Sequence, residues 1–254
     1  MKRTVTNRPL VFAHRGAKRV APENTLPAFE AAIRLGADGV ELDVQYSSDG
    51  KLVVFHDLDL DKTSNGKGRL TSRTFDDLRK LDAGSYFGPQ FHGTRIPTLD
   101  EVLDLAKGKL LVNIELKSLD ISGAVLGIDT VKAVRAHRMV GDVVISSFNP
   151  FALRRSKQAG PEIEHALLLA ADTSAWTRWG VTIHYSKAEG LHPETGMVDA
   201  RYMAAARQRN MPVRVWTVNE EEDMRRLAGL GVDAIISDIP DIALAVLNPM
   251  RAGR

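Results

Sequence analysis

The sequence predicts an α/β fold, a TIM-type (β/α)8 barrel with an inserted segment after a hairpin on the second strand. The chain has 254 residues, which is the size of one such barrel. Short β-rich apolar runs recur along it, and most alternate with helical patterns, as parallel strands with crossover helices do. An open doubly wound sheet is the alternative that this alternation also allows.

The predicted strands outnumber the eight of a barrel by one. They cover Leu10–Ala13, Gly39–Val44, Leu52–His56, Leu110–Leu116, Val143–Ser146, Glu164–Leu169, Glu189–Leu191, Val213–Val218 and Ala234–Ser237. Only the short stretch 45–51, with the turn sequence Ser48-Asp49-Gly50, separates the second run from the third. A parallel connection needs a crossover of a dozen or more residues. Leu52–His56 is therefore predicted to be the return arm of a hairpin, and the other eight strands are parallel.

Capping signals predict where the helices begin and end. Thr25–Leu35 places apolar residues on one face and stops at Gly36, and Asn24 and Thr25 are expected to cap it. Three further starts are predicted from the patterns Thr98 with Glu101, Asn149 before Pro150, and Asn219 with Glu222. The last of these helices is expected to end near Gly231.

The polar stretch 57–95 interrupts the alternation of strands and helices. It is rich in Gly, Asp and Lys, with one short helical piece around Phe75–Leu81. We interpret it as an inserted segment within a single barrel domain that spans residues 1–254. Long loops in compact domains are often binding loops or lids.

Composition excludes several classes of function. Lys and Arg total 34 and Asp and Glu total 32, so the net charge is +2, which argues against a dedicated nucleic-acid binder. The chain has no cysteine, which excludes disulfides, thiolate nucleophiles and zinc–cysteine sites. No secretory signal is visible, and no apolar run approaches the ~20 residues of a spanning helix. We therefore expect a cytoplasmic protein without stable membrane insertion.

Charged residues gather at the ends of two predicted strands. Glu41 and Asp43 are two apart and share a face, and so do Glu115 and Lys117. Three carboxylates aimed into a barrel mouth require compensation. The sequence favours a divalent cation, Mg²⁺ or Ca²⁺, held by Glu41, Asp43 and Glu115. The alternative is a buried salt-bridge network, in which Arg15 and Lys117 pair with the two glutamates.

Two histidines are predicted to converge on these carboxylates. His14 ends the first strand, and His56 ends the hairpin's return arm. Imidazole can accept and donate protons near neutral pH. Arg15 and Lys117 add fixed cations that suit phosphate oxygens. A metal, two cations and two histidines indicate phosphoryl chemistry rather than glycoside hydrolysis, which needs two carboxylates and no phosphate clamp.

These residues stand in an ordered set of motifs. They are His14-Arg15-Gly16, Pro22-Glu23-Asn24-Thr25, Glu41-Leu42-Asp43-Val44, His56-Asp57, Glu115-Leu116-Lys117, Ser146-Ser147-Phe148, Trp216-Thr217-Val218-Asn219 and Ser237-Asp238-Ile239-Pro240. The set resembles that of the glycerophosphodiester phosphodiesterases.

The resemblance implies a TIM-type barrel with an inserted segment after the His-Asp pair. It implies a divalent metal at Glu41, Asp43 and Glu115, acid and base roles for His14 and His56, and phosphate contacts for Arg15 and Lys117. Phe148 and Trp216, at the ends of later strands, are expected to wall the substrate pocket. For Phe148, packing in the core is the alternative.

The expected function is metal-dependent hydrolysis of glycerophosphodiesters, such as glycerophosphocholine or glycerophosphoethanolamine, to sn-glycerol 3-phosphate and an alcohol. Direct attack by water and attack by the substrate's vicinal hydroxyl, through a cyclic phosphate, both fit these residues, as does either assignment of acid and base to the histidines. The alternatives are a lysophospholipase D-like enzyme acting on acylated substrates and a non-catalytic phosphate-ligand binding barrel. The expected partner is a small-molecule phosphodiester, with no nucleic acid; the sequence makes no prediction of oligomeric state.

Overall fold

Eight parallel strands form the centre of the molecule in a computed structural model, which describes residues 7–117, 124–171 and 181–248. The order across the sheet is β7-β6-β5-β4-β2-β1-β9-β8. Isolated parallel bridges from Leu191 to Val213 and from Glu194 to Trp216 join its two edges. The TIM-type barrel is thus confirmed, and the open doubly wound sheet is excluded.

The strand bounds follow the predicted runs closely. They are β1 Leu10–His14, β2 Gly39–Tyr46, β3 Leu52–Val54, β4 Leu111–Leu116, β5 Val143–Ser147, β6 Glu164–Leu169, β7 Gly190–Pro193, β8 Arg214–Val215 and β9 Ala234–Ser237. The hairpin is confirmed, because β3 pairs antiparallel with β2 and places Val54 opposite Val44. The seventh barrel strand, β8, is much shorter than the predicted Val213–Val218.

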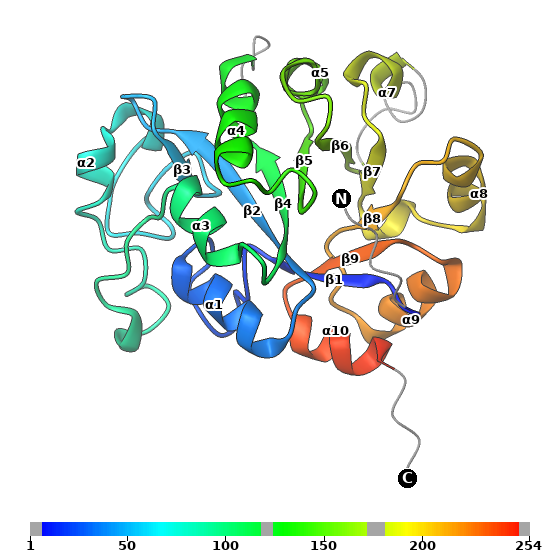
Figure 1. Ribbon diagram of the computed structural model, residues 1–254. Coiled ribbons are helices and arrows are strands. Elements are labelled where there is room, and N and C mark those ends of the chain that lie inside the picture. The colour runs from blue at the N-terminus through cyan, green and yellow to red at the C-terminus, as the bar shows by residue number, and fades with distance from the viewer. Residues whose placement is uncertain (1–6, 118–123, 172–180, 249–254) are drawn as a thin grey trace.

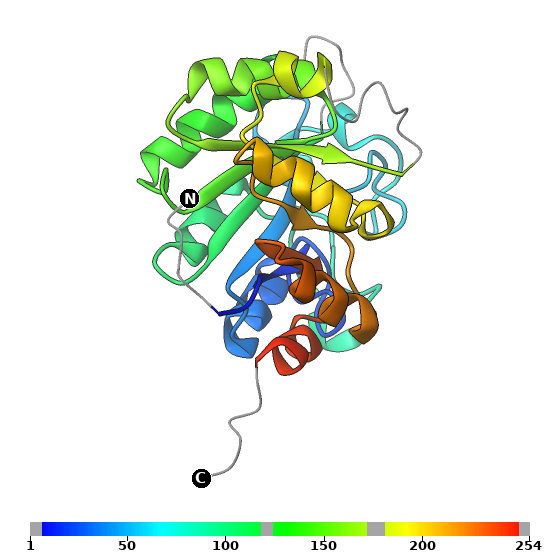
Figure 2. The same ribbon diagram turned by 90° about the vertical axis from the view of Figure 1, so that its right-hand side faces the viewer.

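Helices surround the strands (Figures 1 and 2). They are α1 Leu26–Leu35, α2 Phe75–Leu78, α3 Leu99–Ala106, α4 Ala124–Ala136, α5 Pro150–Ala159, α7 Val181–Ser186, α8 Ala200–Gln208, α9 Glu221–Leu230 and α10 Pro240–Leu247, with short 3-10 turns at Leu70–Ser72, Pro89–Phe91 and Thr195–Met197. The outward residues of β2 and β4, such as Leu42 and Ile114, are fully buried with Phe29 of α1 and Leu103 of α3. Burying this apolar layer stabilises the barrel and leaves its inward face for polar side chains.

Most predicted helix boundaries are confirmed. Thr98 and Glu101 make both bonds of a capping box, and Asn149 accepts from the first backbone amides of α5. Gly36 and Gly231 end their helices in the left-handed region. The predicted capping box of Asn219 with Glu222 is wrong: α9 begins after Glu220, without a side-chain cap.

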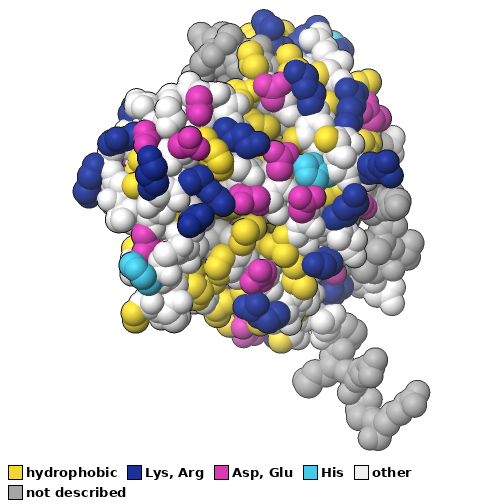
Figure 3. All heavy atoms as spheres, turned by 60° about the vertical axis from the view of Figure 1, so that its left-hand side comes forward, with side chains coloured by type: hydrophobic (Ala, Val, Ile, Leu, Met, Phe, Trp, Pro, Cys, Tyr) yellow, Lys and Arg dark blue, Asp and Glu magenta, His cyan; other side chains and the backbone are white. Residues whose placement is uncertain are grey.

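The stretch 57–95 projects beside the barrel next to α3 (Figure 1). Its apolar residues Leu60, Leu70 and Leu78 are buried in a small cluster with residues just outside it, Val53, Phe55 and Ile96. The predicted helical piece is present as α2. Figure 3 shows cationic and anionic side chains interspersed over this face. Within the described ranges, no helix has both the length and the apolar character to cross a bilayer.

Candidate functional site

The carboxyl ends of the barrel strands surround a cavity of about 150 Å³. Its lining residues come from strands far apart in the sequence: His14, Arg15, Glu41, His56, Asn113, Glu115, Lys117, Phe148, Leu168, Trp216, Thr217 and Ile236. Eight of the nine predicted site residues are among them. The ninth, Asp43, is buried and contacts both Arg15 and Lys117. This end of a TIM barrel is where active sites lie.

Strand register brings the three carboxylates together. Asp43 of β2 lies opposite Glu115 of β4, and Glu41 lies two residues before Asp43 on the same face. One oxygen from each carboxylate lies within 4.8 Å of the others, and all three side chains are buried. Three hard oxygen donors at this separation match what a Mg²⁺ or Ca²⁺ ion needs from a protein.

The two predicted cations lie on either side of Asp43. Lys117 Nζ is 3.1 Å from Asp43 Oδ1 and 2.6 Å from Glu115 Oε1. Arg15 Nε is 3.6 Å from Asp43 Oδ2, and its Nη1 donates to Glu23 Oε1 at 2.8 Å. The salt-bridge network expected as the alternative is therefore present in part. It centres on Asp43, however, whereas Glu41 accepts a hydrogen bond from the Arg15 backbone amide, at 3.0 Å.

The electrostatic environment gives the three carboxyls different pKa values. Burial would raise the pKa of Asp43, but Lys117 and Arg15 bring it down to about 2. Burial and the neighbouring Asp43 raise the pKa of Glu115 to about 7. Burial, Asp43 and Glu115 together raise the pKa of Glu41 well above its usual range. The positive charge around Glu41 and Glu115 is therefore too small to keep the pKa values of these two carboxyls in their usual range.

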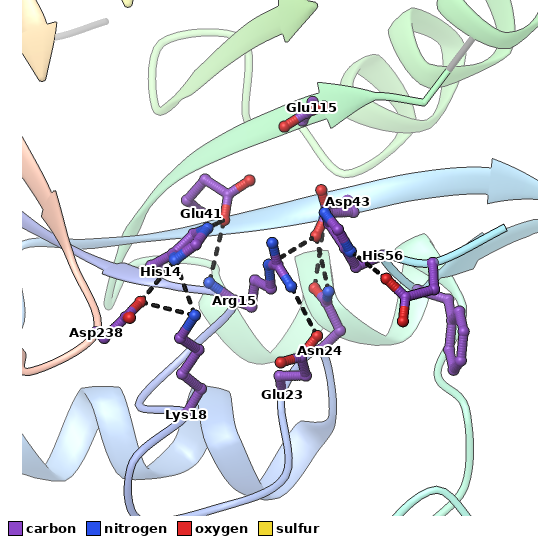
Figure 4. A network of polar contacts seen from close by, with 12 residues as sticks. His14, Arg15, Lys18, Glu23, Asn24, Glu41, Asp43, His56, Glu115 and Asp238 are labelled. Atoms are coloured by element: carbon purple, nitrogen blue, oxygen red, sulfur yellow. Dashed lines mark hydrogen bonds and ion pairs between the residues drawn. The ribbon is translucent and has the colours of Figure 1, made fainter. Parts of the chain in front are cut away.

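His14 and His56 each contact a carboxylate through one ring nitrogen, as Figure 4 shows. His14 Nδ1 is 2.6 Å from Asp238 Oδ1, and His56 Nδ1 is 2.6 Å from Asp57 Oδ1. The Nε2 atom of His14 lies 3.9 Å from Glu41 Oε2. Burial lowers the pKa of both imidazoles, which keeps them neutral near pH 7. A neutral imidazole with a free nitrogen can accept a proton.

The turn after β1 aims Arg15 at the site. Arg15 itself has φ 56°, and Gly16 follows with φ 80°. A Cβ on Gly16 would lie 2.7 Å from Ala28 Cβ, so only glycine fits against α1 here. This turn points the Arg15 amide at Glu41 while its guanidinium reaches Asp43 (Figure 4).

Sequence reasoning missed several residues that support the site. Asn24 was expected to cap α1, but its amide donates to Asp43 Oδ2 at 2.8 Å. Thr25 occupies the N-cap position, yet its hydroxyl donates to the Pro22 carbonyl instead. Glu23 holds Arg15, and the Tyr86 hydroxyl of the segment 57–95 accepts from the Glu23 amide at 3.1 Å. Glu23, Asn24 and Thr25 stand in the motif Pro22-Glu23-Asn24-Thr25, which was the available signal, whereas no motif pointed to Tyr86.

Phe148 and Trp216 form one wall of the cavity. Their rings meet edge to face with centroids 5.6 Å apart. Trp216 Nε1 donates to the His192 carbonyl at 2.7 Å, which fixes the indole. Phe148 is 45% exposed, so the alternative that it packs in the core is wrong.

Comparisons with known proteins agree with the fold and with the family that the motifs resemble. The chain matches the model of the glycerophosphoryl diester phosphodiesterase family over residues 14–242. A glycerophosphodiester phosphodiesterase of Caldanaerobacter subterraneus subsp. tengcongensis is 41% identical over 249 residues, or 96% of this chain and 98% of that protein. A phosphodiesterase of Oleispira antarctica, solved with the product sn-glycerol-3-phosphate, superposes with a TM-score of 0.86 at 32% identity, covering 94% of this chain and 96% of that one. A glycerophosphodiester phosphodiesterase of Agrobacterium tumefaciens gives a TM-score of 0.81 at 30% identity, covering 93% and 99%.

Proposed function

The chain belongs to the glycerophosphoryl diester phosphodiesterase family, and from that premise we propose that it hydrolyses glycerophosphodiesters such as glycerophosphocholine or glycerophosphoethanolamine to sn-glycerol 3-phosphate and an alcohol. One observation carries the proposal. Two histidines, three carboxylates and two cations converge on one cavity at the carboxyl ends of the strands. The bound product of the Oleispira antarctica relative supports the choice of product.

The charges around the cavity support a divalent cation as cofactor. Three carboxylates, those of Glu23, Asp43 and Glu115, pair with the two cations Arg15 and Lys117. Glu41 adds a fourth carboxylate, which accepts from the Arg15 backbone amide. Two negative charges are left unmatched, which is the charge of one Mg²⁺ or Ca²⁺ ion. We therefore assign Glu41, Asp43 and Glu115 as the ligands. When bound, such an ion supplies Lewis-acid polarisation of the phosphoryl group and offsets charge developing in the transition state.

Arg15 and Lys117 are proposed to bind the phosphate. Both line the cavity, and both are largely buried and held by acidic partners. Burial lowers the pKa of Lys117, but Asp43 and Glu115 raise it more, so the ammonium stays charged. Preorganised cations in a water-poor cavity stabilise a transition state that carries more negative charge on its oxygens.

His14 and His56 are proposed to move the protons. One, as neutral imidazole, would deprotonate the attacking water or hydroxyl, and the other, after taking up a proton from solvent, would protonate the departing alkoxide. Both Nδ1 atoms are engaged by Asp238 and Asp57, which leaves Nε2 for the substrate. A glycerophosphodiester that lacks the vicinal hydroxyl separates the two routes of attack. Normal turnover of this substrate excludes the cyclic phosphate as an obligatory intermediate.

The cavity favours soluble glycerophosphodiesters over acylated ones. Its volume of about 150 Å³ is smaller than that of pockets that enclose drug-sized ligands, about 300–1,000 Å³. Phe148 and Trp216 would pack against the glycerol or the head group. A binding barrel without catalysis would need neither histidine, so the pair also favours an enzyme.

Release of glycerol 3-phosphate from glycerophosphocholine, with and without a chelator, tests this function. We expect turnover that stops with the chelator and returns with added Mg²⁺ or Ca²⁺. The control is His92→Ala, which changes an exposed histidine of the segment 57–95 and should leave the rate unchanged. Absence of product with either metal would refute the proposed function. Turnover that persists in the metal-free enzyme would refute the metal dependence.

A further inference from the structure

The motif Ser237-Asp238-Ile239-Pro240 supplies Asp238, the carboxylate that contacts His14 Nδ1. β9 lies beside β1, and the register pairs Ala13 with Ser237. His14 is the last residue of β1, and Asp238 directly follows β9. Two residues 224 positions apart in the chain therefore meet at the rim of the barrel.

Asp238 holds His14 by a short hydrogen bond. Its Oδ1 is 2.6 Å from His14 Nδ1 and 2.8 Å from Lys18 Nζ. Burial would raise the pKa of Asp238, but the bonds from His14 and Lys18 lower it overall, so the carboxylate is ionised. Lys18 Nζ also lies 3.2 Å from His14 Nδ1, but it is nearer to Asp238 Oδ1, and the Asp238–His14 contact is the shortest of the three. An ionised carboxylate only accepts, so the proton between Asp238 Oδ1 and His14 Nδ1 belongs to Nδ1. The Nε2 lone pair of His14 is then free on the side of Glu41 and the cavity.

Asn219 fixes the orientation of that carboxylate. Its Nδ2 donates to Asp238 Oδ2 at 3.0 Å, and its Oδ1 accepts from the Asp238 backbone amide at 2.9 Å. This double contact explains why Asn219 does not cap α9. It also constrains the pair of His14 and Asp238 more than the pair of His56 and Asp57. The latter two are neighbours in the sequence, and the side chain of each is more than a quarter exposed.

We propose that Asp238, oriented by Asn219, is a positioning residue that keeps His14 in the tautomer with its proton on Nδ1 and its Nε2 directed at the substrate. The inference rests on the proposed function, because it assigns His14 a proton-transfer role. Asp238 does not line the cavity, so it acts through His14 rather than on the substrate. A carboxylate behind a histidine commonly sets both the tautomer and the ring orientation.

Asp238→Asn tests this with little change of shape. Asn219 would keep donating to the side-chain oxygen of the new amide, which turns its NH₂ group toward His14. Nδ1 would then have to accept, and the proton would move to Nε2. We expect kcat for glycerophosphocholine to fall about 10–10²-fold with KM within about twofold. The matched control is Asp241→Asn, the same change at an exposed position of α10, with wild-type kinetics.

The tautomer itself is measured by ¹H–¹⁵N NMR of enzyme labelled at histidine, with the His14 signals assigned from their loss in His14→Gln. We expect protonated Nδ1 in the wild type and protonated Nε2 in Asp238→Asn. Asn219→Ala, which keeps the carboxylate, should give a smaller loss of kcat and a mixture of tautomers. If Asp238→Asn does not fold, the wild type and Asn219→Ala provide the comparison.

Three results would overturn the assignment. One is a His14 tautomer that is the same in the wild type and Asp238→Asn. Another is an unchanged kcat. The third is an equal loss of kcat from Asp238→Asn in the wild-type and the His14→Gln backgrounds, because Asp238 would then act elsewhere, for example by neutralising Lys18. The NMR readout needs no turnover, so these results are distinct from failure of the proposed function, which wild-type turnover decides.

Discussion

Replacing Glu41 by glutamine distinguishes two interpretations of the three carboxylates, a metal site and a salt-bridge network. Within the described part of the chain, no Lys or Arg side chain lies at ion-pair distance from Glu41, and His14 Nε2 is 3.9 Å away. Glutamine keeps an oxygen for the Arg15 amide, which donates to Glu41 at 3.0 Å. Glu41→Gln thus removes a charge without leaving a cation unpaired, which is not true of changes at Asp43 or Glu115.

The separation of the carboxylates sets the magnitude. Ligand oxygens within 4.8 Å of one another repel by about 3 kcal/mol per pair at an effective dielectric constant of about 20. The attraction between one carboxylate and a divalent ion is at least as large. We therefore expect the dissociation constant for Mg²⁺ or Ca²⁺ to rise roughly 10²-fold. The metal-free variant should meanwhile unfold at higher urea than the metal-free wild type at pH 8, because a buried repulsion has been removed.

Titration calorimetry with each ion and urea unfolding in chelator measure the two effects. Glu23→Gln is the matched control, since Glu23 pairs with Arg15 but lies outside the triad. Its metal affinity should change much less. Wild-type metal affinity in Glu41→Gln, together with a lower stability of the metal-free protein, would refute the metal site and leave a structural ion-pair network.

Three further predictions concern the histidines and Lys117. His14→Ala and His56→Ala should each lower kcat about 10²–10⁴-fold with unchanged circular dichroism; a loss below tenfold in either contradicts its role. Lys117→Met should lower kcat/KM for glycerophosphocholine about 10–10²-fold, and an unchanged value removes it from the phosphate site. His165 is buried between Ser156 Oγ and a backbone carbonyl, and burial lowers its pKa to about 4. As pH falls below ~6.5 the unfolded chain binds a proton that the folded one does not, so stability should drop by about 2 kcal/mol at pH 5; equal urea midpoint shifts in His165→Gln and wild type would contradict this.

Sequence reasoning worked best where one strand or one turn decides the outcome. Glu41 and Asp43 had to share a face because side chains alternate along a strand. The hairpin followed from a connection too short for a helix, and the box of Thr98 with Glu101 is local chemistry. It failed at Asn24 and Asn219, which have the residue type of a helix cap but donate to Asp43 and Asp238. Tertiary contacts offered both amides a carboxylate, and a charged acceptor makes a stronger hydrogen bond than a neutral one.

The sequence by itself determined the alternation of elements, the residues at the strand ends and the kind of chemistry they can perform, because these depend on backbone periodicity and side-chain type. Only the tertiary structure decided which charges meet. Strand register placed Glu115 opposite Asp43, the positive-φ turn directed the Arg15 amide to Glu41, and the pairing of β1 with β9 brought Asp238 to His14. Such contacts join positions up to 224 residues apart, and closure of the barrel is what makes them neighbours.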